Sequence, residues 1–170
     1  HQTLFFSATI DKKIEALIDT FLVDPVKVSV KTAPTSSHVD QDVIRVGRHQ
    51  KEEVLCSLLK KPEFKKVLIF ASTKMYTEKL YLSLQQKGFK VGSIHGDKRQ
   101  NQRLSTIKSF KNDKLNILVA TDVAARGLDI HDISHVINYD QPATYEDYIH
   151  RVGRTGRADK KGCALTFIEP

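Results

Sequence analysis

Residues 67–70 read Val-Leu-Ile-Phe, and residues 117–120 read Ile-Leu-Val-Ala. Two further runs of this kind follow, His-Val-Ile-Asn at 135–138 and Ala-Leu-Thr-Phe at 164–167. None of the four shows the regular alternation of apolar and polar residues that marks a strand with one face in water. Short, largely apolar runs are typical of strands buried on both faces of a sheet. Weaker strand candidates lie at 26–30, 43–46 and 91–94.

The segments between these runs carry apolar residues at helical spacing. One stripe lies within 54–59 and another within 104–110, and a further helix is predicted at 74–87. This helix is followed by Gly88, a residue suited to the left-handed position at a helix C-terminus. Alternation of buried strands with helices indicates βαβ units and a mainly parallel sheet. The sequence therefore predicts an α/β domain with a central sheet flanked by helices.

The N-terminal residues differ in kind from the rest of the chain. Thr3 to Ser7 resembles a buried strand, and apolar residues between Ile14 and Leu22 predict an amphipathic helix. A polar stretch with one proline, from Ala33 to His38, has the composition of a linker. A strand, a helix and a strand cannot bury their own apolar faces. The predicted organisation is a remnant of another domain at 1–34, a linker at 35–41 and the main domain at 42–170.

Composition limits the classes of protein to which the chain could belong. The net charge of +7 indicates a polyanionic partner, although only weakly. Cys56 and Cys163 lie far apart in no metal-binding spacing, which favours buried thiols in a reducing compartment. No apolar run approaches the roughly 18 residues that span a bilayer, and no signal-peptide pattern opens the chain. These features predict an intracellular protein with no membrane contact, cytoplasmic first and nuclear as the alternative.

Residues 150–157 read HRVGRTGR, with three arginines spaced three residues apart. Glycine stands immediately before two of these arginines, so the backbone can turn tightly and approach a ligand. The planar guanidinium group offers a fork of N–H donors that matches a phosphate group. This pattern favours phosphate binding over an ordinary solvated patch of charge.

Two other polar segments follow predicted strands. Residues 120–130 read ATDVAARGLDI and come after a buried strand, at the end of the sheet where ligands of α/β proteins gather. Each Asp or Thr, taken singly, is as well explained by helix capping. His95-Gly96-Asp97 leads into a helix that opens with residues 100–103 (QNQR), a suitable site for an anion. An ordinary turn before a capped helix remains the alternative for this segment.

Several patterns are absent from the sequence. There is no Gly-x-x-x-x-Gly-Lys-Ser/Thr phosphate loop, no Gly-x-Gly-x-x-Gly dinucleotide fingerprint, and no His and Cys set at metal-ligand spacing. The chain offers arginines for a phosphoryl group but no residues that hold the phosphates and metal of a nucleotide. It therefore contains half of an active site.

Taken together, these segments resemble the C-terminal motifs of the DEAD-box ATP-dependent RNA helicases, in the order of that family and across nearly the whole chain. The matching segments are residues 7–9 (SAT) for motif III, 70–73 for motif IV, 95–97 with 100–103 for the family loop and QxxR element, 119–130 for motif V, and 150–157 for motif VI. Motif VI matches HRxGRTGR without a departure. The resemblance implies a three-layer RecA-like fold.

The resemblance also implies how ATP would be bound. In the family, ATP with Mg²⁺ lies between two RecA-like domains, and the first domain supplies the phosphate loop and the metal ligands. Arg154 and Arg157 would be arginine fingers, and His150 would join the network between motifs VI and III. Asp129 would contact the ribose, with Arg126 and Gly127 shaping that edge. The chain by itself is expected to be inactive.

RNA and the missing domain are the partners that the resemblance implies. RNA would meet both domains through its backbone, with little sequence specificity. The residues implied near the RNA backbone are Thr73, Gly96, Gln100, Arg103 and Thr121, and those implied in domain coupling are Ser7 and Thr9. The apolar stripe between Ile14 and Leu22 has no partner of its own, so self-association is also expected.

Two alternative functions remain open at this point. A related RecA-like DNA helicase is one, although such proteins commonly begin motif VI with Gln, whereas His150-Arg151 stands here. The other is an RNA-binding or annealing module without ATPase activity, which the intact pair Arg154 and Arg157 disfavours.

Overall fold

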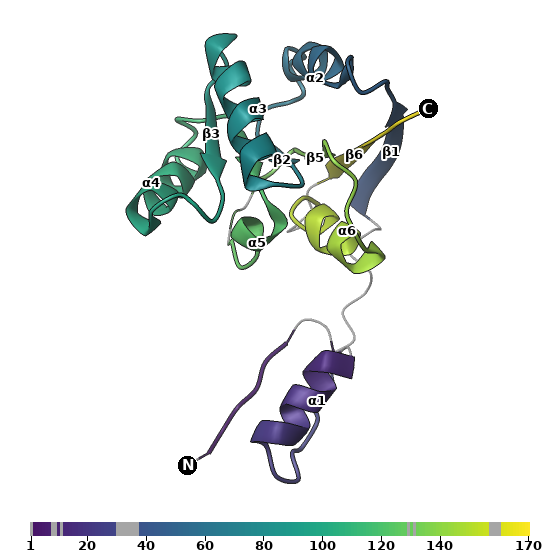
Figure 1. Ribbon diagram of the computed structural model, residues 1–170, viewed down its shortest axis with the longest axis vertical. Helices are drawn as coiled ribbons and strands as arrows, with labels where there is room; N and C mark the ends of the chain where they lie inside the picture. Colours follow the sequence, from purple (N-terminus) through teal and green to yellow (C-terminus); the bar gives the residue numbers. More distant parts are fainter. Residues whose placement is uncertain are drawn as a thin grey trace. The chain divides into compact units, whose positions relative to one another are not determined.

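Figure 1 shows a computed structural model of the chain. It describes residues 2–7, 10, 12–29, 38–128, 130, 132–156 and 161–170. The chain divides into two compact units, His1–Ala33 and Pro34–Pro170.

The larger unit is built on a six-stranded sheet with the strand order β1-β6-β5-β2-β4-β3. Every neighbouring pair of strands is parallel, so the predicted parallel sheet is confirmed. All residues of β2 to β5 are buried, as expected for strands covered on both faces. The strands are β1 (Val39–Arg45), β2 (Val67–Phe70), β3 (Val91–Ile94), β4 (Ile117–Ala120), β5 (His135–Asn138) and β6 (Gly162–Ile168).

Helices cover both faces of this sheet (Figure 1). Right-handed crossovers put connections that run in opposite directions along a sheet on opposite faces. The chain moves toward β3 through α2 and α3, whose leucines pack with Ile69 in one core layer. It returns toward β1 through α4, α5 and α6, which pack with Phe70 in the other. The three-layer RecA-like fold is therefore confirmed. The helices are α2 (Lys51–Leu59), α3 (Lys74–Gln86), α4 (Gln100–Lys111), α5 (Asp122–Ala125) and α6 (Tyr145–Val152).

Local sequence signals account for where these helices begin and end. Thr73 caps α3, its side-chain oxygen accepting a hydrogen bond from the backbone N–H of Tyr76. Thr144 caps α6 in the same way. Gly88 follows α3 with a φ of 84°, a left-handed conformation that glycine adopts without strain. The helix predicted at 74–87 therefore ends where expected.

The order of the strands places a switch point beside β2. The chain leaves β2 toward one edge of the sheet through α3, and leaves the adjacent strand β5 toward the other edge through α6. In open α/β sheets, ligands bind beyond the carboxyl ends of the strands at such a point. We therefore expect the segments that follow β2, β3, β4 and β5 to contain the ligand-binding residues.

The smaller unit contains α1 (Lys12–Phe21), which matches the predicted amphipathic helix. Residues 3–7 differ from the prediction, because they form no strand among the described residues and Phe6 is 86% exposed. The described residues 26–29 are not in a strand either. A strand needs a neighbouring backbone to satisfy its N–H and C=O groups, and the described part of this unit offers none.

The boundary of the larger unit also differs from the prediction. β1 begins at Val39, and residues 39–41, assigned from the sequence to the linker, pair with residues 162–164 of β6. The remainder of the predicted linker, residues 35–37, lies outside the described residues. Along the described parts of the chain, no helix combines the length and the apolar character that crossing a membrane requires.

His135, the first residue of β5, makes the stability of the chain depend on pH. Its ring stacks on Phe64 with the centroids 3.9 Å apart, and burial lowers the pKa of the imidazole below its ordinary value of 6.5. Below about pH 6.5 the unfolded chain therefore binds more protons at His135 than the folded chain does. The contribution of His135 is fully present above that pH and is lost as the pH falls through the folded pKa.

We expect the free energy of unfolding, measured in urea, to fall less steeply between about pH 7.5 and about pH 5.5 in the His135→Gln variant than in the wild type. The other six histidines are unchanged, so the difference in slope isolates His135. Parallel pH profiles for the two proteins would contradict the assignment.

Candidate functional site

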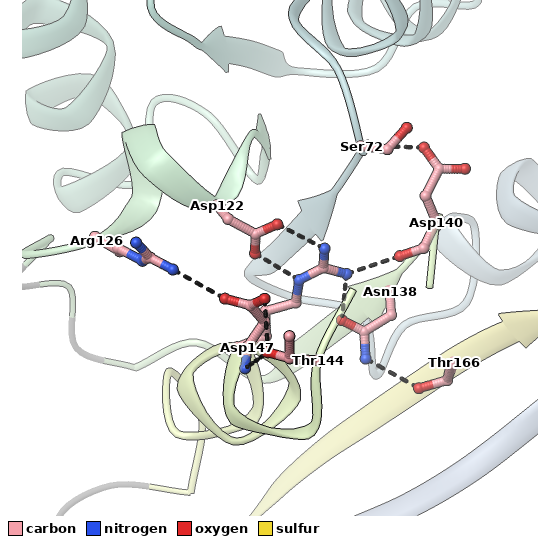
Figure 2. Close-up of polar contacts among 9 residues, drawn as sticks. Ser72, Asp122, Arg126, Asn138, Asp140, Thr144, Asp147 and Thr166 are labelled. Atoms are coloured by element: carbon pink, nitrogen blue, oxygen red, sulfur yellow. Dashed lines mark hydrogen bonds and ion pairs between the residues drawn. The ribbon is translucent and has the colours of Figure 1, made fainter. Parts of the chain in front are cut away.

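Arg151 on α6 makes polar contacts with three of the residues that Figure 2 labels, namely Asp122, Asn138 and Asp140. Its side chain is only 2% exposed. Nε and Nη2 donate to the carboxylate of Asp122 at 2.6 and 2.7 Å. Nη1 donates to Asn138 Oδ1 at 3.2 Å and to the carbonyl oxygen of Asp140 at 2.7 Å. The guanidinium carbon lies 5.0 Å from the centre of the Phe70 ring. The contacts of Arg151 thus join α5 and α6 to the ends of β2 and β5.

The same network continues along the carboxyl ends of the strands (Figure 2). Asn138 Nδ2 donates to Thr166 Oγ1 of β6 at 2.9 Å. The Asp140 carboxylate accepts from the backbone N–H of Ser72 at 2.8 Å, and Lys51 Nζ lies 3.6 Å from the same carboxylate. Sequence reasoning did not single out Arg151, because its spacing in residues 150–157 is the same as that of the other two arginines.

A second contact joins the loop after α5 to the start of α6. Arg126 Nη2 donates to Asp147 Oδ1 at 2.9 Å, and the Arg126 side chain is 60% exposed. Thr144 Oγ1 donates to the other carboxylate oxygen at 2.8 Å. The hydrogen bond from Thr144, and after it the bond from Arg126, lower the pKa of Asp147. Arg126 therefore lies against the first turn of α6, beside the loop that contains Gly127.

Arg154 lies against that same loop. Its Nη1 donates to the carbonyl oxygen of Leu128 at 2.7 Å, next to Gly127, whose φ is 72°. Arg154, His150 and Arg126 all line one small pocket of about 10 Å³. His150 Nδ1 is buried and has no hydrogen-bond partner among the described residues. The structure thus brings together Arg154 and Arg126, which the resemblance assigns to ATP, and His150, which it assigns to the network between motifs VI and III.

Other predicted residues cannot be placed in this way. Asp129, Arg157 and Thr9 lie outside the described residues. Ser7 belongs to the smaller unit and is exposed. The roles assigned to these four residues stay predictions.

The residues predicted to contact RNA follow three neighbouring strands. Thr73 comes after β2, Gly96 after β3 and Thr121 after β4, and these strands are adjacent in the order β2-β4-β3. Hydrogen bonds from Ala71 N to Ala120 O and from Thr121 N to Ile94 O, at 3.0 and 3.4 Å, keep the three ends level. Thr73, Gly96 and Thr121 therefore lie together at the carboxyl end of the sheet.

The loop at Gly96 is closely covered by Lys74. Lys74 Nζ makes a 2.6 Å ion pair with Asp97 Oδ1, and this hydrogen bond lowers the pKa of the Asp97 carboxyl. A Cβ atom at Gly96 would lie 3.0 Å from Lys74 Cε, so the flexible end of the Lys74 side chain would have to shift to make room for it. Sequence reasoning did not assign Lys74, although its place next to Thr73 was a usable signal.

Glu78 on α3 forms hydrogen bonds with residues on both sides of the Gly96 loop. Its carboxylate accepts hydrogen bonds from Ser93 Oγ at 2.9 Å, His95 Nε2 at 3.0 Å and Lys98 Nζ at 2.8 Å. Burial opposes the ionisation of Glu78, but the bonds from Lys98, His95 and Ser93 outweigh it and lower the pKa. A charged Glu78 therefore ties α3 to both sides of Gly96.

Gln100 and Arg103 lie together in the first turn of α4. Arg103 Nη1 is 3.5 Å from Gln100 Oε1, a long contact, and Arg103 Nε is buried with no partner among the described residues. Within the described ranges, no group of three or more His, Cys, Asp or Glu residues could hold a metal ion.

Comparison with known proteins adds sequence relatives to this geometry. The model of the helicase conserved C-terminal domain family matches residues 50–159. The DEAD-box ATP-dependent RNA helicase RhpA of Helicobacter pylori is 42% identical over 99% of this chain and 35% of its own length. The ATP-dependent RNA helicase RhlB of Shewanella amazonensis is 43% identical over 96% of this chain and 38% of its own length. The chain thus spans little more than a third of these relatives.

Solved structures agree with these relatives. The Escherichia coli DEAD-box protein SrmB, bound to the regulator of ribonuclease activity A, has a TM-score of 0.73 and 36% identity over 79% of both chains. Dbp5 of Saccharomyces cerevisiae, bound to RNA and ADP BeF3, has a TM-score of 0.82 and 28% identity over 97% of this chain and 44% of its own. Family model, relatives and structures agree: the chain belongs to the DEAD-box helicases and contains their conserved C-terminal, RecA-like domain.

Proposed function

We propose that this chain is the half of an ATP-dependent RNA helicase that supplies arginines to ATP bound between two RecA-like domains, and that it contacts the RNA backbone during local unwinding. One observation carries the proposal. Thr73, Gly96 and Thr121, which are assigned to RNA, follow three neighbouring strands. Arg154, which is assigned to ATP, stands in the same segment as the buried Arg151. Arg151 binds Asp122, which follows Thr121 directly, so this contact supports a link between the two sets.

On the ATP side, the chain contributes positive charge to the transferring phosphoryl group. Arg154 and Arg157 stabilise the charge that develops on its oxygens. Asp129 contacts the ribose, and Gly127 with Arg126 forms that edge of the cleft. The first RecA-like domain contributes Mg²⁺ binding and most of the phosphate contacts, so this chain alone hydrolyses no ATP.

On the RNA side, the chain holds the sugar-phosphate backbone. The hydroxyl groups of Thr73 and Thr121, the backbone at Gly96, and the side chains of Gln100 and Arg103 contact the strand without reading its sequence. Preference for RNA comes from 2′-hydroxyl contacts and A-form shape. The similarity to the RNA helicases RhpA and RhlB, and to Dbp5 bound to RNA, supports this assignment.

The two ligands act in sequence. ATP closes the two domains, the bound strand is bent and its duplex partner dissociates, and hydrolysis reopens the cleft. His150, together with Ser7 and Thr9, links closure of the domains to hydrolysis. The exposed Leu17 and Phe21 of α1 support packing of the smaller unit on a second copy or on another domain.

Stimulation of ATPase activity tests this function directly. In a two-domain protein made of this chain and a first RecA-like domain, we expect single-stranded RNA, but not single-stranded DNA of the same sequence, to stimulate ATP hydrolysis. Equal stimulation by both nucleic acids would favour a DNA helicase, and RNA binding without hydrolysis would favour an annealing module. Robust ATP hydrolysis by this chain alone would contradict the proposal that it contains only half of the active site.

A further inference from the structure

A pocket of about 500 Å³ lies beside the proposed RNA contacts and contains none of the predicted site residues. Its walls come from the loop before α2, the first turns of α3, and the carboxyl ends of β2, β5 and β6. The volume is in the range of pockets that bind small ligands. It is enough for one nucleotide.

The pocket shares a wall with a proposed RNA contact. Ser72 and Tyr76 line it, and Tyr76 N donates to Thr73 Oγ1 at 3.1 Å, so the pocket and Thr73 use the same turn of α3. The proposed RNA contacts follow β2, β4 and β3, whereas the pocket follows β2, β5 and β6 on the other side of β2. A strand bound at Thr73 and continued along the sheet edge would enter the pocket.

The side chains at the floor of the pocket contact one another. Tyr139 is largely buried, and burial raises the pKa of its phenol to about 12, so the hydroxyl stays neutral. Lys51 Nζ lies 5.4 Å from the centre of the Tyr139 ring and 3.6 Å from the Asp140 carboxylate. Asp140 also accepts from Ser72 N at 2.8 Å. A ligand would therefore meet a preformed surface, which reduces the entropy lost on binding.

The pocket is lined by three cationic side chains and three carboxylates, and two of the cations are not paired with those carboxylates. Two of its carboxylates are already engaged, Glu52 by Lys87 and Ser83, and Asp140 by Lys51. Arg48 and Lys79 make no hydrogen bond or ion pair with the described residues, and the same holds for one acid, Glu169. Beside these two cations, Tyr76 is 41% exposed and offers an aromatic face.

We propose that this pocket is an additional RNA subsite, which takes a nucleotide that continues the strand beyond Thr73. The base stacks on Tyr76, and the phosphate lies between Arg48 and Lys79. Stacked aromatics with nearby cations hold single strands in this way without reading sequence. The inference rests on the proposed function, since it extends the RNA path at Thr73.

The test measures RNA affinity as a function of strand length, in the two-domain protein with a non-hydrolysable ATP analogue. Fluorescence anisotropy would compare single-stranded RNAs of about 6 and about 12 nucleotides. We expect Tyr76→Ala to weaken binding of the longer RNA by about 5- to 100-fold and to leave the shorter RNA unchanged. Lys79→Met should weaken the longer RNA and lower its salt slope by about 0.7.

Matched variants separate the subsite from effects on folding. Met75→Ala changes a 71% exposed residue on the same turn of α3 outside the pocket lining, and Lys60→Met removes an exposed lysine elsewhere. Both should bind like the wild type at either length. Tyr76→Phe keeps the aromatic ring and should restore binding of the longer RNA.

The outcomes distinguish this inference from the proposed function. If the wild type binds neither RNA, the proposed function itself fails. If the wild type binds both, but Tyr76→Ala and Lys79→Met change neither length or both lengths equally, the subsite is overturned and the pocket belongs to another class of partner. Loss confined to the longer RNA, with rescue by Tyr76→Phe, supports it.

Discussion

Changing Arg154 to lysine should slow RNA-stimulated ATP hydrolysis by a two-domain protein by about 10³-fold or more, the range for an arginine finger. Arg154 is held beside the Gly127 loop by its bond to the Leu128 carbonyl oxygen at 2.7 Å. A guanidinium group can keep this contact through one nitrogen and present its other donors to phosphate oxygens. Lysine keeps the charge but, as a point donor, cannot hold both positions.

Steady-state kcat at saturating RNA measures this effect, with RNA affinity followed separately by anisotropy. Because Arg154 is assigned to ATP, RNA affinity should stay within about threefold of the wild type. Arg157→Lys should behave alike. Arg45→Lys, on the exposed edge strand β1, serves as a control and should leave kcat unchanged. Full ATPase activity in both the Arg154 and the Arg157 variant would make the finger assignment untenable.

Changing Arg151 to methionine should lower the free energy of unfolding of this chain by about 3 kcal/mol. The substitution leaves the Asp122 carboxylate and Asn138 Oδ1 without their donor. Asn138 is fully buried, so its oxygen cannot turn to water. Asp122 is 29% exposed, which lets water recover part of its loss. Urea unfolding at constant pH measures the change.

Arg126→Met is the matched control, because it also removes an arginine that pairs with an aspartate between the α5 region and α6. Arg126 is 60% exposed, so its pair should contribute less than about 1 kcal/mol. If the Arg151 variant lost no more stability than the Arg126 variant, the buried network would not hold the domain together.

The predicted strands and helices succeeded where burial leaves a local trace. The runs at 67–70, 117–120 and 135–138 are strands with these bounds, because a strand covered on both faces is largely apolar. The third run is a strand although both of its end residues, His135 and Asn138, are polar. The same reasoning failed at 3–7, where an apolar run forms no strand among the described residues. Apolar character shows that a segment needs a partner, and does not show that the partner is present.

The short helices α5 and α6 were not predicted as helices, although both segments were marked as functional. α5 has only four residues, too few for an apolar period to show. α6 buries Arg151 together with Val152, so a charged residue occupies a core position and disguises the pattern. The burial of Arg151 is explained only when its hydrogen-bond acceptors are known.

The linear pattern alone determined the α/β class, the parallel sheet and the placing of Thr73, Gly96 and Thr121 after strands, because periodicity and turn residues report burial locally. Only the tertiary structure decided that β2 lies between β5 and β4, and therefore that Arg151 meets Asp122, Asn138 and Asp140. These groups lie 11 to 29 residues from Arg151 in sequence. Such pairings depend on the order of strands in the sheet, a property of the packed whole that no single segment encodes.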